Sequence, residues 1–243
     1  MDLRDRVALV TGGARRVGRA IALRLARSGC HVAVHYHTSA AEAEATAAEC
    51  RAAGVRAETF RADLADAGAT AGLVPAVEER LGRLDVLVNN ASVFEPMRLD
   101  DFNPADWERT LRVNLTAPAV LVQAAREALR RAQGRVVNLC DASSSHPWPD
   151  HLAYAVSKGG LVTLTQVLAR ALAPDVNVVG VAPGVAVWPP QYDAALRERI
   201  LARVPLRRAG TAEDIAAAVH FLLAEGDYIT GVVLPVDGGR QIV

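Results

Sequence analysis

The sequence lacks several features that would assign it to a special class of protein. Its 243 residues carry 27 basic and 27 acidic side chains, so no cationic excess favours nucleic acid or an anionic membrane as partner. The longest apolar runs, such as VALV and VVGVAP, are too short to span a bilayer. The opening segment MDLRDRVALVTGG does not have the pattern of a secretion signal. We therefore expect neither nucleic acid nor a membrane as a partner.

Cysteine is also scarce. Cys30, Cys50 and Cys140 are an odd, widely spaced set without a CxxC pair. Such a set suits reduced thiols better than a disulfide framework, so we expect a cytoplasmic protein. There is no internal repeat and no segment that resembles a linker, and 51% of the residues are hydrophobic. We expect one domain over residues 1–243.

Short aliphatic runs alternate with longer segments of helical periodicity. We expect strands at residues 7–10, 31–35, 56–60, 86–88, 136–139, 176–181 and 232–236. We expect helices at residues 19–28, 40–53, 69–81, 104–131, 154–172 and 211–223. Nearly uninterrupted aliphatic strands are typical of a sheet that is covered on both faces. The pattern predicts an α/β fold, a Rossmann-type doubly wound parallel sheet, with ligands at the carboxyl ends of its strands.

The segment TGGARRVG follows the first expected strand and opens directly into an amphipathic helix. Backbone amides at such a helix start, with the helix dipole behind them, favour a bound pyrophosphate, and Gly12, Gly13 and Gly18 permit its close approach. A glycine turn also simply ends strands. Its place after the first strand of an alternating chain favours a dinucleotide.

The segment HYHTS at the end of the second strand contains no carboxylate. An NAD enzyme usually places Asp or Glu there for the adenosine ribose, so its absence favours NADPH. Ser39 and Glu42 also match a helix capping box, which explains Ser39 equally well if no phosphate binds. His35 and His37 alternate on the strand, but no third ligand motif is nearby, so we expect no metal site.

Tyr154 and Lys158 lie four residues apart at the start of an expected helix and so share one face. An ammonium near a phenol favours the phenolate. We therefore expect Lys158 to lower the pKa of Tyr154 toward working pH, and Tyr154 to protonate a carbonyl or imine that receives hydride. Such a pair alone is common on helix surfaces, and it becomes significant here because other motifs accompany it in the sequence.

These companions are ordered motifs that resemble those of the short-chain dehydrogenase/reductase family. They are TGGARRVG, NNAS at Asn89 to Ser92, YAVSK at Tyr154 to Lys158 and APG at Ala182 to Gly184, and they cover essentially the whole chain. The usual family loop is TGxxxGxG, and Arg16 occupies its middle glycine position. That departure, with HYHTSAAEAEA after the second strand, resembles the pteridine reductase branch.

The resemblance implies a set of residues that hold NADPH. These are Gly12, Arg16, Val17, Gly18, His37, Thr38, Ser39, Asp63, Asn90, Ala91, Tyr154, Lys158, Pro183 and Gly184. Asp63 would lie beside the adenine, although on sequence alone it could equally start a helix. Ala186 departs from the many relatives that keep Ser or Thr there for the cofactor phosphates. Asn114 would anchor a water relay to Lys158, and its alternative role is to satisfy backbone groups.

Asp141 stands thirteen residues before Tyr154, where the family at large keeps a serine. An ionised carboxylate would repel a developing oxyanion, so a ketone reductase gains nothing from it. A substrate with a ring nitrogen and an amino group offers donors to the carboxylate and needs a proton on nitrogen. Pteridine reductases, which this stretch resembles, carry aspartate at this place. The alternative is that Asp141 only caps its loop and that Ser143, Ser144 or Ser145 takes the serine role.

Other residues are expected to form the substrate pocket. Phe94 would supply one π-face for a flat ring and the nicotinamide the other, although such a Phe is often part of a core. Arg16 would bridge phosphate and pterin carbonyl, or be a solvated arginine. Residues 182–210 are proline-rich and aromatic, as a mobile lid would be, with Trp188 and Tyr192 as walls. The substrate set is Arg16, Ser92, Phe94, Asp141, Tyr154 and Trp188.

The sequence predicts an NADPH-dependent pteridine reductase, with dihydropterins as expected substrates and folates as further candidates. The alternative within the family is a carbonyl or 3-oxoacyl thioester reductase. A non-catalytic NADPH sensor would have no need of Tyr154 and Lys158 together. The resemblance also implies a homotetramer. The apolar helices at residues 107–121 and 161–172 would suit subunit packing, although burial within the monomer explains the same residues.

Overall fold

A computed structural model describes residues 1–145, 147–188 and 192–243. Within these residues, seven parallel strands form one sheet in the order β3-β2-β1-β4-β5-β6-β7. The strands are β1 Val7–Val10, β2 His31–Tyr36, β3 Ala57–Arg61, β4 Val86–Asn89, β5 Arg135–Leu139, β6 Asn177–Pro183 and β7 Val233–Val236. The order runs outward in both directions from the β1–β4 pair. The predicted doubly wound fold is confirmed.

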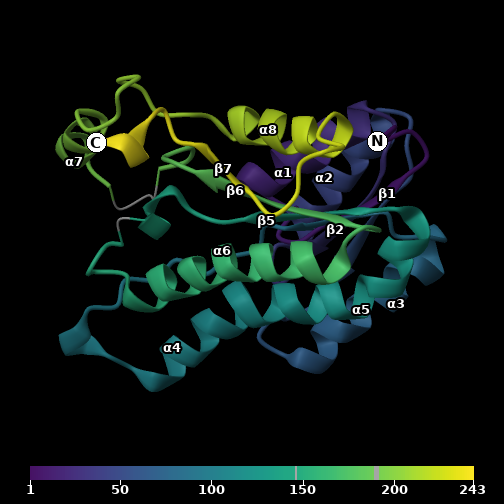
Figure 1. The fold of residues 1–243 in the computed structure, drawn as a ribbon, viewed down its shortest axis with the longest axis horizontal. Helices are drawn as coiled ribbons and strands as arrows, with labels where there is room; N and C mark the ends of the chain where they lie inside the picture. The colour runs from purple at the N-terminus through teal and green to yellow at the C-terminus, as the bar shows by residue number, and fades with distance from the viewer. Residues whose placement is uncertain (146, 189–191) are drawn as a thin grey trace.

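Helices cover both faces of the sheet (Figure 1). Helices α1, α2 and α8 pack on one face, and α3, α5 and α6 pack on the other. The helices are α1 Arg16–Arg27, α2 Ala40–Ala52, α3 Ala67–Leu81, α4 Pro104–Leu111, α5 Ala117–Ala132, α6 Leu152–Leu172, α7 Ala194–Leu201 and α8 Ala212–Ala224. Shorter turns are η1 Leu99–Asp101, η2 Arg112–Thr116, η3 Ala142–Ser145 and η4 Arg240–Ile242. No helix in these described ranges is long and apolar enough to cross a membrane.

Strand β1 shows why the aliphatic runs are uninterrupted. Ala8 and Val10 point into the core beneath α1 and α8, whereas Val7 and Leu9 point into the core on the opposite face. All four side chains are fully buried. Successive strand residues face opposite sides, so a sheet with two covered faces needs apolar residues at both parities.

The helix predicted over residues 104–131 is wrong in one respect, because it is not continuous. Helix α4 ends at Leu111, a π-helical turn occupies Arg112–Thr116, and α5 begins at Ala117. Pro118 explains the interruption. It lacks the N–H that would bond to the carbonyl of Asn114, and its ring crowds that carbonyl. The π turn places the side chain of Asn114 against the backbone of Val93, in the loop after β4, and such turns often occur at functional positions.

Helix α7 lies inside the segment that was predicted only as a lid. Asp193 starts this helix by accepting a hydrogen bond from the amide of Leu196 at 2.7 Å. The lid prediction also covers residues 189–191, which lie outside the described residues. The motion of this segment therefore stays a prediction.

Candidate active site

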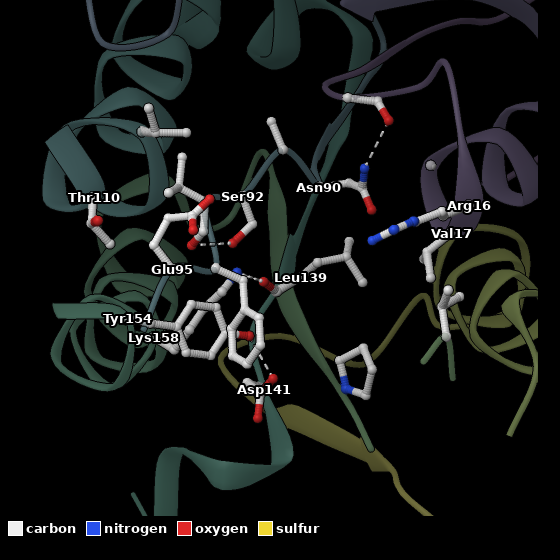
Figure 2. A pocket seen from close by; sticks show the side chains of 18 of the residues that line it. Arg16, Val17, Asn90, Ser92, Glu95, Thr110, Leu139, Asp141, Tyr154 and Lys158 are labelled. Atoms are coloured by element: carbon white, nitrogen blue, oxygen red, sulfur yellow. Dashed lines mark hydrogen bonds between the residues drawn. The ribbon is translucent and has the colours of Figure 1, made fainter. Parts of the chain in front are cut away.

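A cavity of about 1140 Å³ lies at the carboxyl ends of the strands. The predicted catalytic, cofactor and substrate residues line it except Asn114, which lies buried behind it, and Gly13 of the phosphate loop does not line it either. Figure 2 shows Arg16 and Val17 on one side of this space and Tyr154 and Lys158 on the other. The lining residues that were predicted are Gly12, Arg16, Val17, Gly18, His37, Thr38, Ser39, Asp63, Asn90, Ala91, Ser92, Phe94, Asp141, Tyr154, Lys158, Pro183, Gly184 and Trp188.

The loop between β1 and α1 requires glycine at two positions. Gly12 has a φ of +61°, and a Cβ on Gly18 would lie 2.2 Å from the Gly12 carbonyl oxygen. Arg15, the residue before α1, makes no side-chain cap to the first amides of that helix. Amides at a helix start bind phosphate, and these have no side-chain partner at the cap. The loop therefore fits the pyrophosphate of a dinucleotide.

His35 supports this loop from beneath, a role that the sequence reading missed. Its Nδ1 accepts a hydrogen bond from the Gly12 amide at 3.1 Å, and its Nε2 lies 3.2 Å from the Ala62 carbonyl oxygen. The contacts require the neutral tautomer with its proton on Nε2. Burial lowers the pKa of His35 to about 4, which keeps the ring neutral. The spacing of His35 and His37 gave no signal for this role, because residues two apart on a strand face the same side and β2 ends at Tyr36, before His37.

Asn90 ties the end of β4 to the same loop. Its Nδ2 donates to the carbonyl oxygens of Thr11 at 2.8 Å and Gly12 at 3.2 Å. In return, the Thr11 hydroxyl oxygen accepts the backbone amides of Asn90 and Ala91 at 2.9 and 3.0 Å. The two strands at the switch point are thus locked together where the cavity opens.

The capping box predicted for Ser39 and Glu42 is wrong. Ser39 makes no side-chain hydrogen bond to the start of α2, and Glu42 instead pairs with Arg15 at 3.6 Å. Arg15 projects from the neighbouring helix start, a tertiary contact that competes with the local cap. Ser39 lines the cavity with no cap to make, which leaves its hydroxyl for a ligand.

Asp63 does not start a helix, so that alternative is wrong as well. Helix α3 is capped by Asp66, whose side chain accepts the Ala69 amide at 2.8 Å. Asp63 lines the cavity, and its carboxylate lies 3.7 Å from Nε2 of His37. A position beside the adenine stays a prediction.

Asp141 and Tyr154 form the centre of the site. Oδ2 of Asp141 accepts the Tyr154 hydroxyl at 2.6 Å. Oδ1 accepts both the amide and the hydroxyl of Ser143, at 2.7 and 2.6 Å. The carboxylate therefore caps its loop, as the alternative reading held, and also reaches the tyrosine. Ser144 has no hydrogen-bond partner for its hydroxyl among the described residues, and the side chain of Ser145 lies outside the described part.

The expected effect of Lys158 on Tyr154 is wrong for this structure. The pKa of Tyr154 is raised well above 10, first by burial and then by the carboxylate of Asp141. The Lys158 ammonium lies 5.7 Å from the centre of the tyrosine ring and donates to the Leu139 carbonyl oxygen at 2.7 Å. Burial also lowers the pKa of Lys158. Tyr154 is thus held as a phenol, the form that can donate a proton.

Asn114 braces the site through the backbone of the NNAS loop. Its Oδ1 accepts the Val93 amide at 2.8 Å, and its Nδ2 donates to the Val93 carbonyl at 2.9 Å. Nδ2 also donates to the Ser157 hydroxyl at 3.0 Å. The structure thus shows the role of satisfying backbone groups. The water relay stays a prediction.

Phe94 belongs to an aromatic cluster beside the proton donor. Its ring stacks on His151 with centroids 4.3 Å apart, and it meets Tyr154 edge to face at 4.7 Å. Phe94 lines the cavity whereas His151 does not, so His151 supports it from behind. Trp188 and Tyr192 both line the cavity, as expected of pocket walls, with ring centroids 6.4 Å apart.

Several lining residues were not predicted. They come from α4, from the loop before α6 and from the turn after β7, which meet only in the folded chain: Asp106, Arg109, Thr110, Trp148 and Arg240. None belongs to a recognisable motif, and no local pattern in the sequence distinguishes them from ordinary surface residues.

Comparison with known proteins shows which family this chain belongs to. A family model described as enoyl-(acyl carrier protein) reductase matches residues 12–241. The chain belongs to the short-chain dehydrogenase/reductase family. Its relatives in this family include 3-oxoacyl-(acyl-carrier-protein) reductase FabG of Staphylococcus aureus, which is 37% identical over 240 residues, 97% of this chain and 98% of the relative.

Solved structures from the family superpose over almost the whole chain. A short chain dehydrogenase from Burkholderia cenocepacia J2315, in complex with NADP, is 39% identical, with a TM-score of 0.93 over 99% of this chain and 100% of its own. FolM alternative dihydrofolate reductase 1 from Brucella canis, complexed with NADP, is 35% identical. Its TM-score is 0.93 over 100% of this chain and 96% of its own. The predicted family is confirmed. The pteridine reductase branch stays a prediction.

Proposed function

We propose that this protein is an NADPH-dependent reductase of pterins, and that it reduces a ring C=N bond of a dihydropterin or dihydrofolate. The observation that carries the proposal is the contact between Asp141 and Tyr154, because it places a carboxylate beside the proton donor. A carboxylate at this position suits a substrate that offers N–H donors and disfavours one that develops an oxyanion.

NADPH is the cofactor in this proposal, and when bound it supplies the hydride. The glycine cradle at Gly12 and Gly18 would hold its pyrophosphate, and the segment after β2, which contains no carboxylate, would accept the 2′-phosphate. Solved relatives from two organisms carry NADP, which supports this choice.

The proton for the substrate nitrogen comes from the chain itself. Tyr154 is held as a phenol and delivers its proton to the ring nitrogen as the carbon is reduced. Asp141 holds that hydroxyl in place and accepts the amino or N–H group of the ring. Lys158 is fixed to the Leu139 carbonyl and supplies positive charge beside the resulting phenolate.

The second candidate is reduction of a 3-oxoacyl thioester. It is favoured by the relatives named FabG in Staphylococcus aureus and Staphylococcus epidermidis, at 37% and 34% identity. The FolM structure from Brucella canis favours the pterin reading at 35% identity. Global identity therefore does not separate the two. We base the choice on Asp141, which contacts the reacting region.

The deciding experiment follows NADPH oxidation with a dihydropterin, dihydrofolate and a 3-oxoacyl thioester offered in parallel. We expect turnover of one or both pteridines and none of the thioester. Asp141→Ala should abolish pterin reduction and leave NADPH affinity near normal. Ser144→Ala is the matched control in the same loop, since its hydroxyl has no partner among the described residues. Turnover confined to the thioester would establish the second candidate instead.

The remaining expectations also stand as proposals. We propose one domain that acts in the cytoplasm, where the three buried free cysteines would stay reduced. We propose a homotetramer that uses α6, because Val156 and Val167 on this helix are 46% and 57% exposed. Light scattering on a sizing column would test the assembly, and a monomer mass would exclude it.

A further inference from the structure

A tight turn after β7 positions the side chain of Arg240 at the cavity. The side chain of Asp237 accepts the amides of Gly239 and Gln241, both at 2.8 Å. Gly238 and Gly239 have φ angles of +67° and +86°, which other residues rarely adopt. This turn fixes the start of η4, whose first residue is Arg240. In Figure 1 the C-terminal end lies beside α7, at the end of the molecule where α6 begins.

Arg240 lines the cavity without an ionic partner. Its guanidinium lies 4.9 Å from the centre of the Trp148 ring. Within residues 1–145, 147–188 and 192–243 no carboxylate forms an ion pair with it, whereas Arg15, another lining cation, pairs with Glu42. A guanidinium held over a ring by a cation–π contact keeps N–H donors free for other partners. Arg240 thus presents donors to the cavity in a fixed place.

A continuous aromatic wall leads from the proton donor to this cation. Tyr154 contacts Phe94 at 4.7 Å between ring centroids, and Phe94 contacts Trp148 at 6.3 Å. Trp148 then lies under Arg240. A flat ring held against Phe94 would direct its substituent along Trp148, and the end of that substituent would meet Arg240.

We propose that Arg240 is a specificity-determining residue that binds an anionic group on the substituent of the substrate. A planar carboxylate matches the fork of a guanidinium, and a phosphate is matched by the same donors. The identity of the ring rests on the proposed function, in which case the anion is the carboxylate of a folate-type tail. In a thioester carrier the anion would be a phosphate.

The first test measures binding rather than turnover. Folic acid, which has a dicarboxylate tail, and biopterin, which has an uncharged one, are titrated calorimetrically into the NADP⁺-loaded protein. Arg240→Gln should weaken the affinity for folic acid about tenfold. It should change the affinity for biopterin by less than about twofold. Arg240→Lys should restore only part of the affinity for folic acid, because lysine keeps the charge but lacks the fork. Arg199→Gln is the matched control, because Arg199 is exposed on α7 and does not line the cavity.

The outcomes separate this proposal from the proposed function. If the wild type binds neither pteridine, the proposed function fails. The same variants are then compared on a 3-oxoacyl coenzyme A and on its N-acetylcysteamine analogue, which has no phosphate. Selective loss of the coenzyme A thioester in Arg240→Gln would keep Arg240 as the anion site. The proposal would be overturned if Arg240→Gln lost affinity equally for charged and uncharged ligands, or lost none. It would also be overturned if the protein bound no ligand of either series.

Discussion

The Tyr154 hydroxyl donates to Oδ2 of Asp141 at 2.6 Å, and this bond adds to burial in keeping the tyrosine protonated. Hydrogen bonds to a carboxylate are short and strong, and they stabilise the donor in its protonated form. The tyrosine is thereby a ready general acid. This arrangement suits reduction, in which the substrate takes up a proton, better than oxidation of an alcohol, which begins with proton removal.

The pH profile of reduction should report this bond. Activity needs Tyr154 protonated, and its pKa is raised well above 10, so we expect no alkaline loss from this group between about pH 7 and 9. Asp141→Asn leaves burial in place but removes the charge that is the second cause of the raised pKa, so the alkaline limb should move to lower pH. Single-turnover rates measured across pH check both statements. An alkaline limb that stays in place in the variant would remove Asp141 from the control of Tyr154.

Folding stability should fall in acid because of His35. Its pKa is about 4 in the folded protein against 6.5 in the unfolded chain, so the unfolded state binds more protons between these values. The contribution is fully present above about pH 6.5 and is lost as the pH falls toward 4, with a limit of about 3 kcal/mol.

Two variants of His35 isolate that contribution. His35→Asn can still accept the Gly12 amide, whereas His35→Leu cannot. In both variants, the free energy of unfolding measured in urea should fall less between about pH 6.5 and 4 than it does in the wild type. Only His35→Leu should also weaken NADPH binding strongly, since it leaves the Gly12 amide unpaired. A variant limb as steep as that of the wild type would assign the acid loss to other groups.

Gly18→Ala should destroy the cofactor cradle. The added methyl would lie 2.2 Å from the Gly12 oxygen and 2.5 Å from Nδ2 of Asn90, so the loop must move. We expect NADPH affinity to fall by at least about a hundredfold, read by fluorescence titration. Gly72→Ala is the control, because a Cβ there meets nothing within 4 Å in the interior of α3. That change should stabilise the protein by about 1 kcal/mol and leave binding unchanged.

Asn114→Leu should lower stability and activity together. The amide of Asn114 satisfies both backbone groups of Val93, and loss of these bonds costs about 2–4 kcal/mol. Ser157→Ala leaves both Val93 bonds in place but removes the third contact of the amide and the bond from the Ser157 hydroxyl to the Tyr154 carbonyl, and should cost about 1–2 kcal/mol. Thermal unfolding and NADPH oxidation measure the two effects. Full activity in Asn114→Leu would exclude a positioning role for this residue.

The sequence by itself determined the fold class, which follows from local chemistry. It also identified many residues of the cavity, a large share of them through the family resemblance. Aliphatic runs such as VALV specify strands that are covered on both faces, and short motifs such as YAVSK place their side chains by helix or strand geometry alone. The shared face of Tyr154 and Lys158 and the glycine loop could therefore be predicted without coordinates.

Only the tertiary structure decided what those groups do to one another. The pKa of Tyr154 rises because of burial and the Asp141 carboxylate, and the spacing of Tyr154 and Lys158 encodes neither. Arg15 takes Glu42 away from its expected cap, and Arg240 reaches the cavity from the far end of the chain. Such contacts join segments that are distant in sequence, so their geometry is set by how the layers pack.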